Sequence, residues 1–146
     1  MASISWCMKQ KQGIRLSESS DNLCTAYLKE ADETLHVMLG ITGRWKVITA
    51  YYACYHALYA LLQKAGITSE IHDCTIALMS LFDFTKEQTK FMLHLKEERI
   101  NVQYYLQAPK TIDEAQVKLF VADCKSKTHI TADQISVIQS TLKVQK

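Results

Sequence analysis

The sequence predicts an all-α protein: an antiparallel up-and-down helical bundle with a four-helix core and one or two short extra helices. Three observations lead to this prediction. The 146 residues contain only 4 Gly and 1 Pro, too few for the many turns of an all-β fold. Hydrophobic residues make up 48% of the chain and charged residues 22%, which are values of a globular protein. The length corresponds to one domain, so we expect residues 1–146 to form a single helical unit.

The first half of the chain predicts an N-terminal arm followed by two long helices. We expect residues 1–16 to form a mobile arm or a short added helix, and residues 17–108 to hold the core helices. A cluster of Ser, Asp and Asn is suited to begin a helix that runs from about Ser20 to Leu39. The next helix runs from about Arg44 to Ala65 and ends at Gly66, because glycine favours the cap that follows a helix.

Later helices are predicted from a repeated start signature. Three segments fit the capping box, in which a Thr hydroxyl and a Glu or Gln side chain three residues later each bond a free backbone N–H: Thr85–Gln88, Thr111–Glu114 and Thr131–Gln134. A short helix near residues 69–82 precedes them. The predicted helices that follow span about residues 86–107, stopped before Pro109, and the C-terminal pair 112–127 and 132–143 within residues 111–143.

The helix at 86–107 is unusual because it has two apolar sides. At 100° per residue, one sector holds Phe91, Leu95, Val102 and Leu106, and nearly opposite lie Leu93, Ile100 and Tyr104. The second side predicts a central place in the bundle or a partner chain. Arg99 lies at the edge of the first sector, where a buried charge needs a partner. Its side chain either extends to the surface, pairs with a carboxylate, or is free to bind a phosphate.

The helix at 44–65 carries an aromatic stripe. Its members recur every three or four residues: Trp45, Ile48, Tyr52, Tyr55, Tyr59 and Leu62. Alanines and leucines cover the other side, so this helix is expected at the centre of the bundle. The stripe has two interpretations, core packing or a platform on which nucleobases stack.

Charge and cysteine content exclude several classes. The net charge of +2 excludes a strongly basic nucleic-acid coat but not a local basic patch. The five cysteines are odd in number and widely spaced, which predicts reduced thiols in a cytoplasmic protein rather than a disulfide framework or a zinc site. The longest uncharged run, residues 47–63, is shorter than the ~20 residues of a membrane-spanning helix.

Two segments resemble a known family. Residues 50–78 read AYYACYHALYALLQKAGITSEIHDCTIAL, and residues 99–106 read RINVQYYL. Together they resemble the HEPN superfamily (higher eukaryote and prokaryote nucleotide-binding domain), in particular its small stand-alone UPF0332-like prokaryotic and archaeal branch. The resemblance implies a helical bundle that dimerises through the motif-bearing helices, here those at 86–107 and 44–65. It also implies pairing with a minimal nucleotidyltransferase, as in some toxin–antitoxin systems.

The resemblance also implies a metal-free reaction in active members. Their motif has an Arg that binds the scissile phosphate and, after four to six residues, a His that supports attack by the 2′-hydroxyl. Arg99 matches the Arg, but Ile100 follows where a polar residue is common, and Asn101 comes one place late. The expected His position holds Tyr104, Tyr105 and Leu106. Since a phenol has an unperturbed pKa of about 10 and an imidazole about 6.5, the motif is degenerate as a ribonuclease.

The histidines offer no clear replacement for the missing motif His. His72 opens its short helix and is expected to cap it or to bond across to the helix at 86–107. Its acidic and cysteine neighbours do not form a complete metal-ligand set. His56 is expected to be a hydrogen-bonded core histidine. His36, His94 and His129 are expected on the surface.

The sequence therefore predicts a nucleotide- or RNA-binding or partner module, with two alternatives: an active endoribonuclease toxin, or a structural bundle with Arg99 paired internally. The candidate catalytic residues are Arg99 and Tyr104. The candidate ligand-binding residues are Arg99, Asn101, Tyr104, Tyr105, Tyr52, Tyr55, His56 and His72. We expect no metal and no cofactor. The expected partners are a second copy of the chain, a minimal nucleotidyltransferase, and RNA or a nucleotide, with no membrane.

Overall fold

The protein is mostly helical. The computed structural model describes residues 1–145. Its elements, in chain order, are α1 (Ile4–Lys9), β1 (Arg15–Leu16), α2 (Asp21–Leu39), α3 (Arg44–Lys64), β2 (Ile67–Thr68), α4 (His72–Ala77), the 3-10 helix η1 (Leu78–Leu81), α5 (Lys86–Gln103), α6 (Glu114–Lys127) and α7 (Ala132–Lys143). The all-α prediction is confirmed, and the segment at 1–16 contains the short added helix α1.

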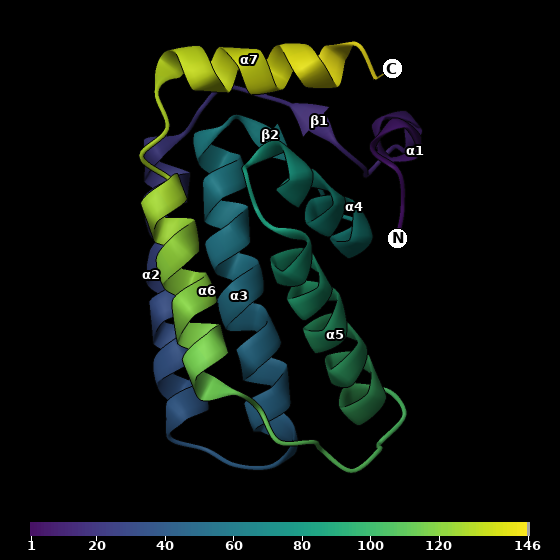
Figure 1. Ribbon diagram of the computed structural model, residues 1–146, viewed down its shortest axis with the longest axis vertical. Helices are drawn as coiled ribbons and strands as arrows, with labels where there is room; N and C mark the ends of the chain where they lie inside the picture. The colour runs from purple at the N-terminus through teal and green to yellow at the C-terminus, as the bar shows by residue number, and fades with distance from the viewer. Residues whose placement is uncertain (146) are drawn as a thin grey trace.

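Four long helices, α2, α3, α5 and α6, run alternately up and down along the long axis of the molecule (Figure 1). The last helix, α7, lies across one end of this bundle, and α1 and α4 lie near the same end. A two-stranded antiparallel sheet, which the sequence did not predict, pairs Arg15 with Thr68 and Leu16 with Ile67. It ties the segment before α2 to the segment after α3, and so closes this end of the fold.

The predicted capping residues at helix starts are confirmed at three places and wrong at one. Ser20 accepts a hydrogen bond from the Leu23 backbone N–H at the start of α2. The capping boxes that begin α5 at Thr85 and α7 at Thr131 are both formed. At α6, Asp113 rather than Thr111 is the cap, and its carboxylate accepts from the Gln116 N–H. A carboxylate at that place also complements the positive end of the helix dipole, which favours the later start.

Helix ends differ more from the prediction. Gly66 has φ +70, the left-handed conformation expected of the residue after α3. In contrast, α5 ends at Gln103, four residues before the predicted end. Leu106 adopts φ +52, and the Gln107 N–H bonds back to the carbonyl of Asn101 at 3.0 Å. This tight turn uses a backbone carbonyl that a longer helix would have bonded, so the segment around Tyr104 to Leu106 unwinds.

The cysteine prediction was wrong for one pair. Cys7 of α1 and Cys74 of α4 form a disulfide, with 5.7 Å between their Cα atoms. Their separation of 67 residues in sequence gave no sign of this proximity. Cys24, Cys54 and Cys124 are free and buried, as expected of reduced thiols. Burial raises the pKa of all three thiols.

The centre of the bundle is α3, as its composition predicted. The main apolar cluster joins residues of α3 to residues of α2, α5 and α6, among them Ala31, Ala53, Leu58, Leu95 and Val121. The residues buried in α3 cover most of the helix, and the strip of Trp45, Thr49, Tyr52, His56 and Tyr59 is exposed or half-buried. Within residues 1–145, no helix is both long and apolar enough to cross a bilayer.

Candidate functional site: a buried arginine among aromatic rings

Arg99 is held inside the protein near the C-terminal end of α5. Its side chain is only 7% exposed. One terminal nitrogen, Nη1, donates to the Tyr52 hydroxyl at 3.1 Å and to Gln103 Oε1 at 3.4 Å. Gln103 lies one helical turn after Arg99 on the same face of α5, whereas Tyr52 comes from α3. The guanidinium therefore fills the seam between these two helices.

No carboxylate neutralises this charge within residues 1–145, because none of the ion pairs there includes Arg99. The preceding residue, Glu98, is also buried, but it pairs with Lys110 at 3.4 Å. Arg99 Nε is buried and has no hydrogen-bond partner. A buried charge without a counter-ion is costly, so this guanidinium retains an unused N–H and an unbalanced positive charge.

Three tyrosine rings surround the guanidinium. Its central carbon lies 4.8 Å from the ring centre of Tyr51, 5.5 Å from Tyr52 and 5.8 Å from Tyr104. These are cation–π distances, and the rings partly offset the missing counter-ion. Tyr51 is fully buried, whereas Tyr104 caps the end of α5 and is 65% exposed. The Tyr104 side is therefore the open side of the site.

His72 connects the site to α4. Its Nδ1 lies 2.7 Å from the Tyr51 hydroxyl, and its ring stacks on that of Tyr55 at 4.2 Å. Burial first, and then the positive charges of Arg99 and Lys96, lower the pKa of His72 to about 4. His72 is thus a neutral imidazole at pH 7. Burial also raises the pKa of Tyr51. The hydrogen bond between Tyr51 and His72 therefore joins two neutral groups.

His56 lies on the other side of Tyr52. The two ring centres are 5.8 Å apart, and Tyr27 of α2 lies 6.0 Å from His56. Burial lowers the pKa of His56. The sequence predicted a hydrogen-bonded core histidine, but His56 is half-buried and its Nδ1 is buried without a partner. Within residues 1–145, His56 Nδ1 and Arg99 Nε are the buried side-chain atoms without a hydrogen bond, and Tyr52 lies between them.

The predicted site residues divide into two groups. Arg99, Tyr104, Tyr52, Tyr55, His56 and His72 come together around the seam between α3 and α5. Asn101 is half-buried two residues along α5 and is not among the hydrogen-bond partners of Arg99. Tyr105 is 70% exposed and belongs to the turn after α5.

Sequence analysis missed two participants. The Tyr51 ring lies against the guanidinium of Arg99, and Gln103 Oε1 accepts a hydrogen bond from Arg99 Nη1. Both could have been found from helical spacing, since Tyr51 precedes Tyr55 by four residues and Gln103 follows Arg99 by four. Residues four apart lie on one helical face, so each belongs to a side already singled out.

The arrangement suits the binding of an anion. Lys96, one turn before Arg99, pairs with Asp73 of α4 at 2.6 Å and keeps α4 close to α5. Its charge is balanced, so Arg99 supplies the net positive charge of the site. Flat neutral rings adjoin that charge, and an aromatic face is a surface on which a base can stack. Within residues 1–145, no group of three or more His, Cys, Asp or Glu side chains is placed to hold a metal ion.

The chain was also compared with known proteins. A scan of protein-family models, a search of curated proteins and a search of solved structures each returned no match. Membership of the HEPN superfamily therefore stays a prediction from the residues at 50–78 and 99–106.

Proposed function

We propose that the protein is a binding module for a phosphate-bearing ligand, a nucleotide or RNA, with Arg99 as the phosphate-binding residue. The observation that carries this proposal is the buried guanidinium, which has no carboxylate partner among residues 1–145 and whose Nε–H is unused. A phosphate oxygen would accept that N–H and balance the charge at once. The half-buried Tyr52 and exposed Tyr104 would stack on the attached base.

The ribonuclease alternative has less support. The charge of Arg99 acts on the imidazole of His72, and a group with a pKa of about 4 is a weak proton acceptor at pH 7. Its Nδ1 is also already engaged with the Tyr51 hydroxyl. The structural alternative, in which Arg99 pairs with a carboxylate, lacks its carboxylate within residues 1–145.

A second copy of the chain is the proposed first partner, through α5 and α3. Apolar side chains remain exposed where the end of α5 meets the start of α3, with Trp45 57%, Tyr104 65% and Leu106 72% exposed. Val102 of α5 packs on Val47 and Ile48 of α3, which brings the two helix ends together. Exposed apolar groups gathered at one place favour a protein contact. Light scattering that shows only a monomer would remove this part of the proposal.

The resemblance adds a second partner and a location. A minimal nucleotidyltransferase, in a toxin–antitoxin-like pair, is the proposed protein partner, and the cytoplasm is the proposed compartment. Disulfides are rare in a reducing cytoplasm. In that compartment the bond between Cys7 and Cys74 would be open to reduction by cellular dithiols.

The binding proposal is tested with adenosine monophosphate (AMP) by isothermal titration calorimetry. Replacing Arg99 by glutamine removes the charge and keeps a polar side chain. Because hydrogen bonds to charged groups contribute about 1.5–3 kcal/mol, we expect the affinity for AMP to fall about 10- to 100-fold. The matched control is Lys90→Gln, which removes one exposed charge from the same helix and should leave the affinity unchanged.

Two results would contradict the proposal. The first is an Arg99→Gln protein that binds AMP and a short single-stranded RNA as tightly as the unchanged protein. The second is the absence of any AMP or RNA binding by the folded, unchanged protein. Cleavage of the RNA that depends on Arg99 would instead favour the endoribonuclease alternative.

A further inference from the structure

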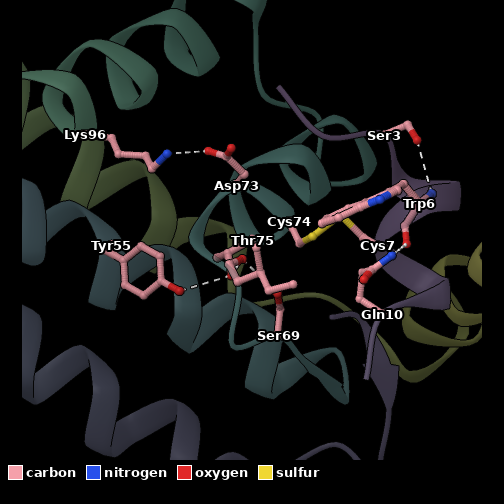
Figure 2. The surroundings of a disulfide bond; sticks show 11 residues. Ser3, Trp6, Cys7, Gln10, Tyr55, Ser69, Asp73, Cys74, Thr75 and Lys96 are labelled. Atoms are coloured by element: carbon pink, nitrogen blue, oxygen red, sulfur yellow. Dashed lines mark hydrogen bonds and ion pairs between the residues drawn. A yellow bond between two sulfur atoms is a disulfide. The ribbon is translucent and has the colours of Figure 1, made fainter. Parts of the chain in front are cut away.

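The first turn of α4 joins the site to the rest of the fold through four consecutive residues. His72 contacts Tyr51 of α3, Asp73 pairs with Lys96 of α5, and Thr75 hydrogen-bonds Tyr55 of α3 at 3.1 Å. Between them, Cys74 is bonded covalently to Cys7 of α1. Figure 2 shows the disulfide on one side of this turn, with the Asp73–Lys96 and Tyr55–Thr75 contacts on the other.

The helix α4 is held in place by tertiary contacts, with Cys74, Thr75, Ile76 and Ala77 buried. It has six residues, and no side chain caps its N-terminus. Isolated helices of this length are unstable, so its position depends on tertiary contacts. The polar contacts of His72 and Asp73 lie at the partly buried edge of the site, whereas the Thr75–Tyr55 hydrogen bond and the disulfide are buried. The covalent bond is thus the strongest single restraint on the turn that carries His72.

The other partner of the bond, α1, also depends on it. This helix lies outside the four-helix bundle, beside α4 (Figure 1). The segment after α1 is held by the Ile14 N–H, which bonds the carbonyl of Cys7, and by the Glu70 N–H, which bonds the carbonyl of Gln12. A six-residue helix with so few backbone ties can open locally without unfolding the bundle. Local opening would expose the buried sulfurs to a reductant.

We infer that the Cys7–Cys74 disulfide is a redox switch on the Arg99 site: the oxidised bond holds α4 in the binding-competent position, and reduction weakens phosphate binding. The inference rests on the proposed function. The reductant is a dithiol. Its thiolate attacks one sulfur, the S–S bond breaks, and each cysteine gains one electron and one proton. The dithiol loses two of each as it closes to its own disulfide.

Reduction weakens binding because it changes the position of α4, not because it changes the charge of the site. Once the bond is open, α1 no longer anchors α4, and His72 and Asp73 lose the fixed point at Cys74, which directly follows them. His72 then leaves the Tyr51 hydroxyl more often, and Tyr51 and Tyr55 lose the ring that packs on them. Since Tyr51 lies under the guanidinium, the orientation of Arg99 becomes less defined. A less ordered site binds its ligand more weakly because ordering must be completed on binding.

The test measures AMP affinity in the oxidised full chain and after reduction with dithiothreitol, with the redox state checked by mass spectrometry. We expect the dissociation constant to rise at least fivefold on reduction. The Cys7→Ser/Cys74→Ser double variant should bind as the reduced protein does under both conditions. The matched control, Cys24→Ser, removes a buried free thiol of α2 and should keep the full redox difference. Equal AMP affinity in the two states would overturn the inference.

A measurement without ligand separates failure of the switch from failure of the proposed function. On reduction, amide hydrogen exchange should accelerate more in residues 72–77 than in the centre of α3. If neither state binds AMP, the proposed function fails, and the exchange of α4 alone decides whether the bond holds this turn. Unchanged exchange in α4 would overturn the inference. So would a loss of protection in the centre of α3 as large as the loss in α4, because the bond would then support the whole fold rather than the site.

Discussion

The two sides of α3 carry different kinds of side chain and have different roles. One side carries Ala50, Ala53 and Ala57, all fully buried in the apolar cluster shared with α2 and α6. The other side carries Tyr51, Tyr52, Tyr55 and His56, and faces α4 and α5 with polar groups at its edge. Small side chains permit close helix packing and leave no polar atom to satisfy.

The two sides differ in whether their buried polar atoms are hydrogen-bonded. Both buried side-chain atoms without partners in residues 1–145, Arg99 Nε and His56 Nδ1, lie on the tyrosine side. Buried polar atoms without partners reduce stability, and in native proteins they concentrate at functional sites. We conclude that the alanine side stabilises the fold. The tyrosine side lowers its stability and leaves a charge free to bind a ligand.

The largest effect is expected on the alanine side of the comparison. Phe120 of α6 is buried in the core cluster and stacks on Phe84. Phe120→Ala should lower the free energy of unfolding by about 3–5 kcal/mol, measured by urea denaturation, because it leaves a large cavity. AMP affinity of the folded protein should change by less than about twofold. A strong loss of affinity with little loss of stability would contradict the division of roles.

A smaller loss of stability is expected at the disulfide. The Cys7→Ser/Cys74→Ser protein should lose about 2–4 kcal/mol of unfolding free energy, because the bond closes a long loop in the unfolded chain. Urea denaturation of the oxidised protein and the double variant measures the difference. Circular dichroism should show that the bundle remains folded. A double variant as stable as the oxidised protein would show that the bond restrains little.

Unlike the two changes above, Arg99→Met should not lower the free energy of unfolding. Methionine fills similar space without a charge, so the unfolding free energy should stay equal or rise, by up to about 1–2 kcal/mol. AMP affinity should fall at least tenfold in the same protein, by calorimetry. If Arg99 were instead half of a buried ion pair, the substitution would cost about 3–5 kcal/mol. Such a loss would refute the functional interpretation of the tyrosine side.

The smallest effect is a pH dependence from His72. Its pKa is lowered to about 4 in the folded protein from 6.5, so the unfolded chain binds more protons between these values. The contribution of His72 to stability is therefore fully present above pH 6.5 and is lost as the pH falls toward about 4. Urea denaturation at pH 7.5 and 5 should show a smaller loss in His72→Gln than in the unchanged protein. His94→Gln, an exposed control on α5, should keep the full dependence.

Periodicity and capping residues were sufficient to predict the long helices, because each needs only local chemistry. The starts at Ser20, Thr85 and Thr131 are examples. The disulfide and the β1–β2 pair depend on contacts between distant residues, which local patterns do not contain. Arg99 was predicted from its place beside an apolar sector. The sequence left three alternatives open for its charge, because only the packed structure shows which carboxylates lie near Arg99.

The most direct test of the unused Arg99 N–H is nuclear magnetic resonance of the arginine Nε–H groups during titration with AMP. The Nε–H of Arg99 should be slow to exchange with solvent, because it is buried, and its signal should shift in a saturable way as AMP is added. The exposed Arg44 signal should barely move. An Arg99 signal that stays fixed at saturating AMP, in a folded protein, would show that this guanidinium does not bind phosphate.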